Sequence, residues 1–167
     1  MATPTSLPAT FVAGDVLTAA QMNNLRGAFR VLQIVQGSTT TPVTNSTNTL
    51  ASTGLTATIT PQATTSKILI LVNQSGCSKS VANANNRMAL VLYRGASAIQ
   101  TIAANAFFTG TALTLAGFTL NGAYLDSPAT ISATTYTTYF SNPNNLADVQ
   151  VQTYSETSTI TLMEISA

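Results

Sequence analysis

Large apolar residues near the start of the chain recur at helical spacing. They form a narrow stripe that predicts a short amphipathic helix over residues 18–30. The stripe consists of Met22, Leu25, Phe29 and Leu32. Thr18 and Gln21 have the spacing of a capping box, in which each side chain accepts a hydrogen bond from the backbone N–H of the other residue. Leu17 before the cap and Met22 after it have the spacing of a hydrophobic staple. The helix is therefore expected to begin at Thr18.

Residues 1–17 are expected to form an extended arm ahead of this helix. Pro4 and Pro8 restrict the residue before each of them to extended conformations. One small helix on a β-rich chain has little core of its own to rest on, so we expect residues 1–30 to attach the chain to a partner. The apolar side chains expected to make that attachment are Leu7, Phe11, Val12, Leu17, Met22, Leu25 and Phe29.

From residue 31 onward, apolar and polar side chains alternate, which predicts strands. Leu55–Thr60 is the clearest case, with three apolar side chains on one face and three threonines on the other. Lys67–Val72 and Met88–Arg94 are apolar at successive positions, which predicts central strands covered on both faces. Turns are expected at Pro61–Ser66 and at Arg94–Ser97.

The remaining chain predicts several more short strands and one polar connection. Gly37–Thr49 is rich in Thr and Asn and is expected to be a surface loop or a ragged edge strand. About eight short strands with turns between them favour a jelly-roll-type β-sandwich. The sequence thus predicts an all-β chain, with an attachment segment at 1–30 and a sandwich domain at 31–167. The other expected strands are Val31–Gln36, Ala98–Gln100, Ala106–Thr109, Ala112–Leu120, Thr134–Phe140, Val149–Tyr154 and Thr159–Ile165.

The low fraction of charged residues indicates that the domain works in an assembly rather than as a free monomer. Only 7% of the residues are charged, against about 25% in typical domains, and the net charge is +1. A soluble monomer normally carries a dense mixture of surface charges that opposes self-association. We therefore expect a protein that works as an oligomer. The basic residues are scattered along the sequence, so no nucleic-acid partner is expected.

The residue types needed for most catalysis are missing or isolated. The sequence has no histidine, which excludes catalytic triads that use it, histidine metal sites and the usual general base at neutral pH. Its single cysteine, Cys77, cannot form a disulfide within the chain and is expected to be a buried apolar filler. The five carboxylates show no paired spacing. We expect no enzyme, no metal site and no cofactor.

The N-terminal residues and the lengths of the apolar runs indicate in which cellular compartment the protein is made. The N-terminus lacks the basic start and apolar block of a signal peptide, and the apolar runs are far shorter than the about 20 residues that span a bilayer. We expect synthesis in the cytoplasm and no association with a membrane.

A small set of aromatic residues and one carboxylate are candidates for trimer contacts or for facing a ligand. Tyr136 and Phe140 would share one face of a strand, with Tyr139 on the other. The favoured interpretation is core packing plus a subunit contact, and the alternative is a sugar-binding surface. Glu164 stands among apolar residues, where a carboxylate needs a cation or a backbone donor. Asp126, in Asp-Ser-Pro, is expected to be a turn residue. The complete candidate set is Tyr124, Tyr136, Tyr139, Phe140, Tyr154 and Glu164.

Three segments of the chain resemble small structural proteins of tailed bacteriophages. Residues 11–23 (FVAGDVLTAAQMN) are similar to the opening of tail and virion fibre proteins. Residues 59–69 (ITPQATTSKIL) are similar to a strand-turn-strand of their β-domains, echoed by Leu92–Gly95. Residues 158–165 (STITLMEI) are similar to their last strand. The resemblance covers both ends and the middle of the chain.

This resemblance implies a jelly-roll, tumour-necrosis-factor-like domain that forms a homotrimer on the virion exterior, made and assembled in the host bacterial cytoplasm. Its partner would be the major capsid protein or another virion protein, bound through the N-terminal arm. The chain has no shaft repeat and no heptads, which favours a capsid decoration or cement protein. The alternative is a short tail fibre or tail-tip adhesin, whose partner would be a host surface glycan.

Overall fold

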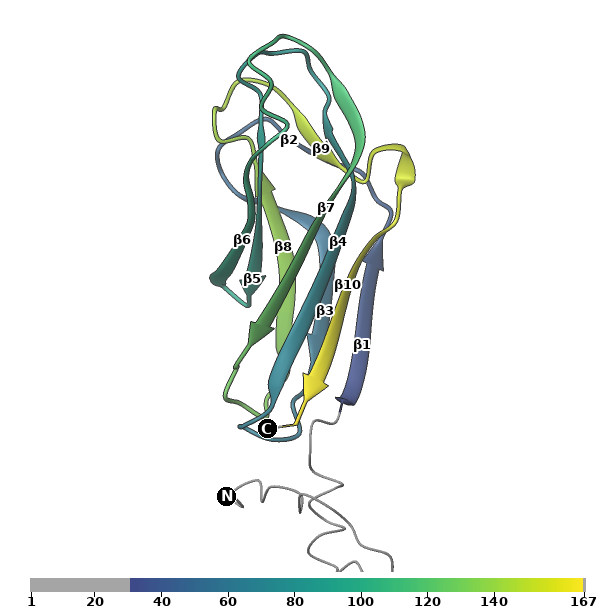
Figure 1. The fold of residues 1–167 in the computed structure, drawn as a ribbon, viewed down its shortest axis with the longest axis vertical. Helices are drawn as coiled ribbons and strands as arrows, with labels where there is room; N and C mark the ends of the chain where they lie inside the picture. The colour runs from purple at the N-terminus through teal and green to yellow at the C-terminus, as the bar shows by residue number, and fades with distance from the viewer. Residues whose placement is uncertain (1–30, 167) are drawn as a thin grey trace, which may run out of the picture.

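A computed structural model describes residues 31–166, which fold into antiparallel strands (Figure 1). The predicted arm and helix, with all seven attachment residues, lie outside the described residues. In chain order the strands are β1 (Val31–Thr39), β2 (Val43–Asn45), β3 (Ala51–Ile59), β4 (Lys67–Lys79), β5 (Met88–Arg94), β6 (Ser97–Ala106), β7 (Leu115–Asp126), β8 (Thr134–Ser141), β9 (Val149–Val151) and β10 (Ser158–Ile165). A single 3₁₀ turn, η1 (Thr153–Ser155), precedes β10.

The strands form two sheets that pack face to face as a sandwich. The six-stranded sheet has the order β1-β10-β4-β9-β2, with β7 pairing β4 as well. The four-stranded sheet has the order β3-β8-β5-β6. β1 begins and β10 ends at the same end of the sandwich, the lower end in Figure 1. Residues 1–30 therefore join the domain at its lower end.

The core lies between the sheets in two apolar clusters. The lower one includes Leu55, Ala57 and Ile59, so the predicted alternation of β3 is confirmed. The upper one includes Cys77, which is fully buried as predicted, and Phe140. Burial of such side chains is worth about 1.5–3 kcal/mol each and provides most of the force that holds the sheets together.

A layer of buried polar side chains joins the two sheets between these clusters. The Thr138 hydroxyl donates to Gln74 Oε1 at 2.9 Å, and Gln74 Nε2 donates to the Ser158 hydroxyl at 3.0 Å. The Thr53 and Thr138 hydroxyls are 2.5 Å apart, and all four residues are buried. Because a buried polar group without a partner is costly, this network favours one relative placement of the sheets.

Several predicted strand bounds need correction. The predicted strand at Ala106–Thr109 is wrong, because β6 ends at Ala106 and a turn follows. The Gly37–Thr49 segment contains the end of β1 and all of β2, which pairs β9. β4 is thirteen residues long and runs past Val72 to Lys79. The Gly37–Thr49 segment and the second half of β4 are polar, and their strand structure comes from long-range pairing rather than from apolar alternation.

Candidate association surface

The outer face of the six-stranded sheet carries a row of large apolar side chains near the lower end. Ile34 lies opposite Met163, Met163 opposite Leu69, and Leu69 opposite Leu125. Side chains directly opposite one another have Cβ atoms about 4.5–5.5 Å apart, so the four form a continuous surface. Ile34 is 60% exposed and Leu125 is 49% exposed. We call these four residues the apolar row.

This row exists because β4 is apolar on both of its faces. Ile68, Ile70 and Val72 point into the core and are buried. Leu69 and Leu71 therefore point outward, and Leu71 is 39% exposed. The prediction that both faces of this strand are covered is wrong for the single chain, since only the inner face is covered.

Two further rows lie above the apolar row on the same face. The middle row is Gln36, Thr161, Leu71 and Ala123. The upper row is Ser38, Thr159, Asn73 and Asn121, which we call the amide row. The face thus changes from fully apolar at the lower end to hydroxyl and amide groups at mid-height.

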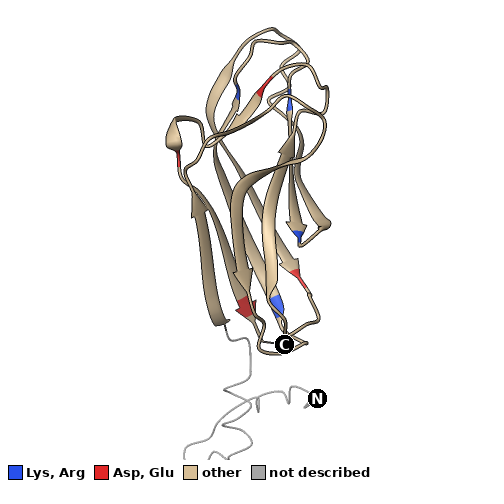
Figure 2. Ribbon diagram, turned by 180° about the vertical axis from the view of Figure 1, so that it is seen from behind, with Lys and Arg blue, Asp and Glu red and all other residues tan. Residues whose placement is uncertain are grey.

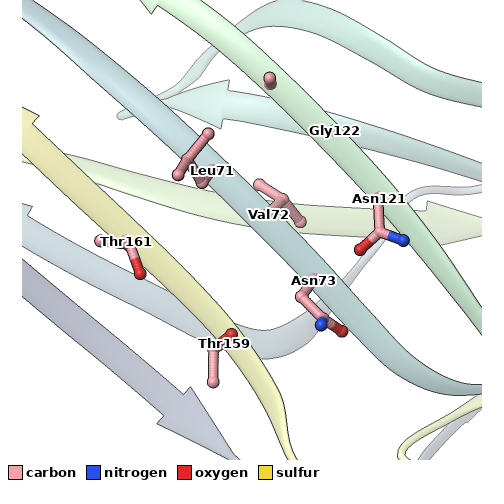
Figure 3. Close-up of a pocket in the computed structure, with 8 residues that line it drawn as sticks. Leu71, Val72, Asn73, Asn121, Gly122, Thr159 and Thr161 are labelled. Carbon is pink, nitrogen blue, oxygen red and sulfur yellow. The ribbon is translucent and has the colours of Figure 1, made fainter.

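An open hollow of about 370 Å³ lies over the middle and amide rows (Figure 3). Its lining is Leu71, Val72, Asn73, Asn121, Gly122, Ala123, Thr159 and Thr161. None of these residues titrates near neutral pH, so the hollow offers no acid, base or nucleophile. It can offer van der Waals contact and neutral hydrogen bonds.

Within residues 31–166, the charged residues lie near strand ends and in loops (Figure 2). The three rows, all within residues 31–166, contain no charged side chain. The ion pair found among the described residues joins Arg94 and Asp126, with Nη1 at 2.9 Å from Oδ1. The three rows are therefore neutral, whereas the exposed Lys67, two residues before Leu69 on β4, lies on the same face below the apolar row.

Two of the predicted contact residues, Tyr136 and Phe140, belong to the core. Both are fully buried within the single chain, so their prediction as trimer contacts or ligand-facing residues is corrected. The reason is the alternation of β8, which turns them inward together. Tyr139 points to the opposite face, where the centroid of its ring lies 4.6 Å from the centroid of the Tyr93 ring.

Tyr124 and Tyr154 lie in different surroundings. Tyr124 is partly buried and packs against the lower core cluster. Tyr154 sits in η1 and is 81% exposed, so it is open to a partner. The structure thus scatters the predicted aromatic cluster over the core and two separate surfaces.

Asp126 ends β7 as a buried group rather than lying in a turn as predicted. The Tyr136 hydroxyl donates to Asp126 Oδ2 at 2.7 Å, and Arg94 Nη1 donates to both carboxylate oxygens at 2.9 Å. Burial and the adjacent carboxylate raise the pKa of Tyr136 far above its ordinary value. Because Asp126 is in one sheet and its partners are in the other, the cluster connects the two sheets.

Glu164 is also buried within the single chain and offers no surface to a subunit. The prediction that it needs a backbone donor is confirmed, since the Gln62 N–H donates to Oε1 at 2.7 Å. Gln33 Nε2 donates to Oε2 at 2.6 Å. Burial acts to raise the pKa of Glu164, but these donors outweigh it and hold the pKa below its ordinary value. The carboxylate thereby ties the turn at Pro61–Ser66 to β1.

The sequence pattern does not identify the apolar row as a candidate association surface, although the apolar residues that form it are visible in the sequence. The apolar run within Lys67–Val72 predicts a strand that is covered on both faces. One face of such a run can instead remain open for another molecule. Which residues stand side by side across four strands depends on the pairing register.

Neither a scan against protein-family models nor a search of curated proteins finds a match to this chain. Among residues 31–166, no three His, Cys, Asp or Glu residues gather as a metal site would require. The same residues include no helix with the length and apolar character to cross a membrane. The function is therefore argued from the surfaces that the fold presents.

Proposed function

We propose that this chain is a homotrimeric structural protein on the exterior of a tailed-phage virion, acting as a capsid decoration or cement protein. The observation that carries the proposal is the apolar row on the outer face of the six-stranded sheet, with the neutral rows above it. Isolated exposed apolar side chains are normal, but a contiguous exposed apolar patch is typical of an interaction surface. The proposed role includes no catalysis, no cofactor, no nucleic acid and no membrane.

The strand pairing supports a jelly roll as the finer description of the sandwich. β1 pairs β10, β3 pairs β8, β4 pairs β7 and β5 pairs β6. The pairs are nested, with the first long strand beside the last and the two middle strands beside each other. A chain folded back on itself as one long hairpin and then wrapped into two sheets has this nesting, as eight-stranded jelly rolls do.

The apolar row supports self-association through the outer face. Its four side chains come from β1, β10, β4 and β7, so they span the width of the sheet. Covering each fully would contribute about 1.5–3 kcal/mol, repeated at every interface of the oligomer. A contact between two different patches of the same chain closes into a ring when the rotation between copies allows it. A three-membered ring is the form that the phage resemblance implies.

Attachment is assigned to residues 1–30, with Phe11, Leu17, Met22, Leu25 and Phe29 as anchors. They join the domain at the lower end, beside the apolar row. In a ring, three such segments would leave from the same end and reach one surface together. Three linked contacts bind far more tightly than one, because the second and third are intramolecular. The proposed partner is the major capsid protein or another virion protein.

A tail-tip adhesin is the second candidate function. It is favoured by the Tyr93–Tyr139 pair on the four-stranded sheet and by Tyr154, which is 81% exposed. Aromatic rings of this kind offer flat apolar surface and a hydroxyl to a host glycan. The apolar row does not discriminate between the two functions, since both require a trimer.

Two measurements test the proposal. Sedimentation of the full chain at micromolar concentration should give a trimer, also at high salt, because a neutral interface has few charges to screen. A stable monomer would refute it. The copy number per virion, read from a gel of purified particles, then separates the roles. Hundreds of copies indicate capsid decoration, whereas about 3–18, as in closed symmetric tail assemblies, indicate the adhesin.

A further inference from the structure

The apolar row continues downward to the point where residues 1–30 join the domain. Val31, the first residue of β1, pairs with Ile165 one step below the row and is 51% exposed. Ile34 and Leu125 stand at the two ends of the row, about 14 Å apart across three strand spacings. The apolar surface therefore reaches the residue to which the N-terminal segment is attached.

The partner that covers this surface has to be apolar and elongated. The row presents aliphatic side chains and one thioether, which do not replace the hydrogen bonds that a polar partner would lose to water. Elsewhere in residues 31–166, the exposed large apolar side chains are scattered and offer no line of comparable length. They are Val81, Phe108, Ile131 and Leu146 in four loops, Phe118 on β7 and Tyr154 in η1.

The sequence supplies such a line in the helix that it predicts over residues 18–30. Met22, Leu25 and Phe29 form the apolar stripe of this helix. At a rise of 1.5 Å per residue, the stripe is about 10 Å long before the reach of its side chains is added. Because the row is about 14 Å wide, one helix is long enough to cover it.

The helix of one copy is badly placed to cover the row of the same copy. β1 begins at Val31 and runs upward from the lower end of the sandwich (Figure 1). A connection that reverses the chain between a helix and a strand takes about 2–6 residues. A helix that ends at residue 30 leaves none for this turn, so it leads away from its own sheet face.

We propose that the predicted helix of each copy packs on the apolar row of the next copy around the ring. The inference rests on the proposed function, because it presupposes a homotrimer, and it names the two different patches that close the ring. It assigns Met22, Leu25 and Phe29 to the neighbouring copy. Phe11 and Leu17 of the arm remain the anchors to the virion.

The first test makes the stripe polar in the full chain. Glutamine is a good helix former, so Met22→Gln with Leu25→Gln and Phe29→Gln removes apolar contact and preserves the predicted helix. The association constant should fall by about a hundredfold or more, because three apolar side chains lose their burial. Sedimentation at micromolar concentration should then show monomers. The matched control, Phe11→Gln with Leu17→Gln, should remain a trimer and lose binding to virions instead.

The second test detects the contact directly through disulfides. A chain with Leu25→Cys and a chain with Leu69→Cys, distinguished by an affinity tag, are produced together and oxidised mildly. Mixed dimers should appear on a non-reducing gel, while neither variant should cross-link by itself. The native Cys77 is fully buried and present in both chains, so it does not produce the difference.

Other arrangements of the copies give other products. Dimers of Leu25→Cys alone would mean that two helices meet, and dimers of Leu69→Cys alone would mean that two sheet faces meet. A disulfide within one Leu25→Cys/Leu69→Cys chain, without larger products, would mean that the segment covers its own row. Each of these products, the absence of mixed dimers, or a glutamine variant of the stripe that stays trimeric would overturn the inference.

The wild type separates this failure from that of the proposed function. A trimeric wild type with any of those outcomes leaves the proposed function standing, whereas a monomeric wild type would overturn both.

Discussion

At the scale of single residues, Glu164 shows how one buried carboxylate organises the lower end of the sandwich. Its oxygens accept from Gln33 of β1 and from the backbone of Gln62 in the turn before β4. Hydrogen bonds to a charged group are worth about 1.5–3 kcal/mol. They hold together three segments beside the point where residues 1–30 join the domain.

Glu164 is expected to make folding stability depend on acid pH. Its pKa in the folded chain lies below the unfolded value, so the ionised form is favoured by folding. That contribution is complete above the unfolded pKa of about 4.3 and is lost as the pH falls through the folded pKa. Glu164→Gln removes the titration, so its free energy of unfolding should change less between pH 6 and pH 3 than that of the wild type.

Urea unfolding of both proteins across this pH range measures the difference. The other carboxylates are the same in both proteins, so the comparison isolates Glu164. Parallel pH profiles would show that the carboxylate makes no net contribution to acid sensitivity. At pH 7 the variant should be less stable by roughly 1–3 kcal/mol, because neutral hydrogen bonds replace charged ones.

Cys77 is expected to be chemically inert in the folded chain. Burial raises the pKa of its thiol from 9.0 to about 12, so the reactive thiolate is about a thousandfold rarer than in an exposed cysteine. Alkylation with iodoacetamide at pH 8 should be slower in the native protein by at least that factor than in urea. Mass spectrometry over time measures both rates. Fast labelling without urea would mean that the upper core cluster opens readily.

At the scale of elements, β4 carries two roles on its two faces. Its inner side chains hold the core, and its outer side chains form the centre of the apolar row with β10, β7 and β1. β1 in turn approaches β3 closely at Gly37, where a Cβ atom would lie 1.9 Å from the Thr56 carbonyl oxygen. The absence of a side chain there lets the two sheets close along this edge.

The separation of the two faces predicts that the fold and the assembly can be changed independently. Leu69→Asn with Met163→Asn makes the centre of the apolar row polar while leaving the inner face intact. The protein should sediment as a monomer, with the free energy of unfolding of the single domain changed by less than about 1 kcal/mol. Circular dichroism confirms the fold, and analytical ultracentrifugation measures the mass.

The same two changes on the other sheet provide the control. Thr56→Asn with Thr58→Asn alters exposed positions of β3 and should leave the oligomer intact. A trimeric Leu69→Asn/Met163→Asn protein would show that the copies meet through a different surface.

At the scale of the whole molecule, the two ends of the domain differ. Residues 1–30 join at the lower end, and the loops at the upper end are bound together by asparagines. Asn86 Nδ2 donates to the Asp148 carbonyl at 2.9 Å, and Asn142 Nδ2 donates to Asn86 Oδ1 at 2.9 Å. Under the proposed function, these loops would point away from the surface that the protein covers.

Deleting residues 1–17 should abolish binding to virions while the remaining chain still folds and trimerises. Under the proposed function, the apolar side chains of this segment gain their burial from a virion partner rather than from the sandwich. Gel analysis of particles incubated with the truncated protein measures occupancy, and sedimentation checks the oligomer. Wild-type occupancy would place attachment in the β-domain instead.

The sequence by itself determined the features that depend on neighbouring residues. Alternation and apolar runs predicted β5 at its observed bounds, the inward face of β3 and the turn at Pro61–Ser66. These follow from local geometry, because a strand turns successive side chains to opposite faces whatever it pairs with. The burial of Cys77 and the need of Glu164 for a backbone donor likewise follow from the chemistry of single side chains.

Only the tertiary structure decided which face of each strand stays open and which residues become neighbours. From the sequence, Tyr136 and Phe140 were candidates both for the core and for a subunit contact, and the sheet packing placed them in the core. Ile34, Met163, Leu69 and Leu125 are far apart along the chain, and the pairing register alone lines them up. A shift of one residue would turn each of these side chains to the other face. The association surface therefore depends on long-range pairing, which local patterns do not encode.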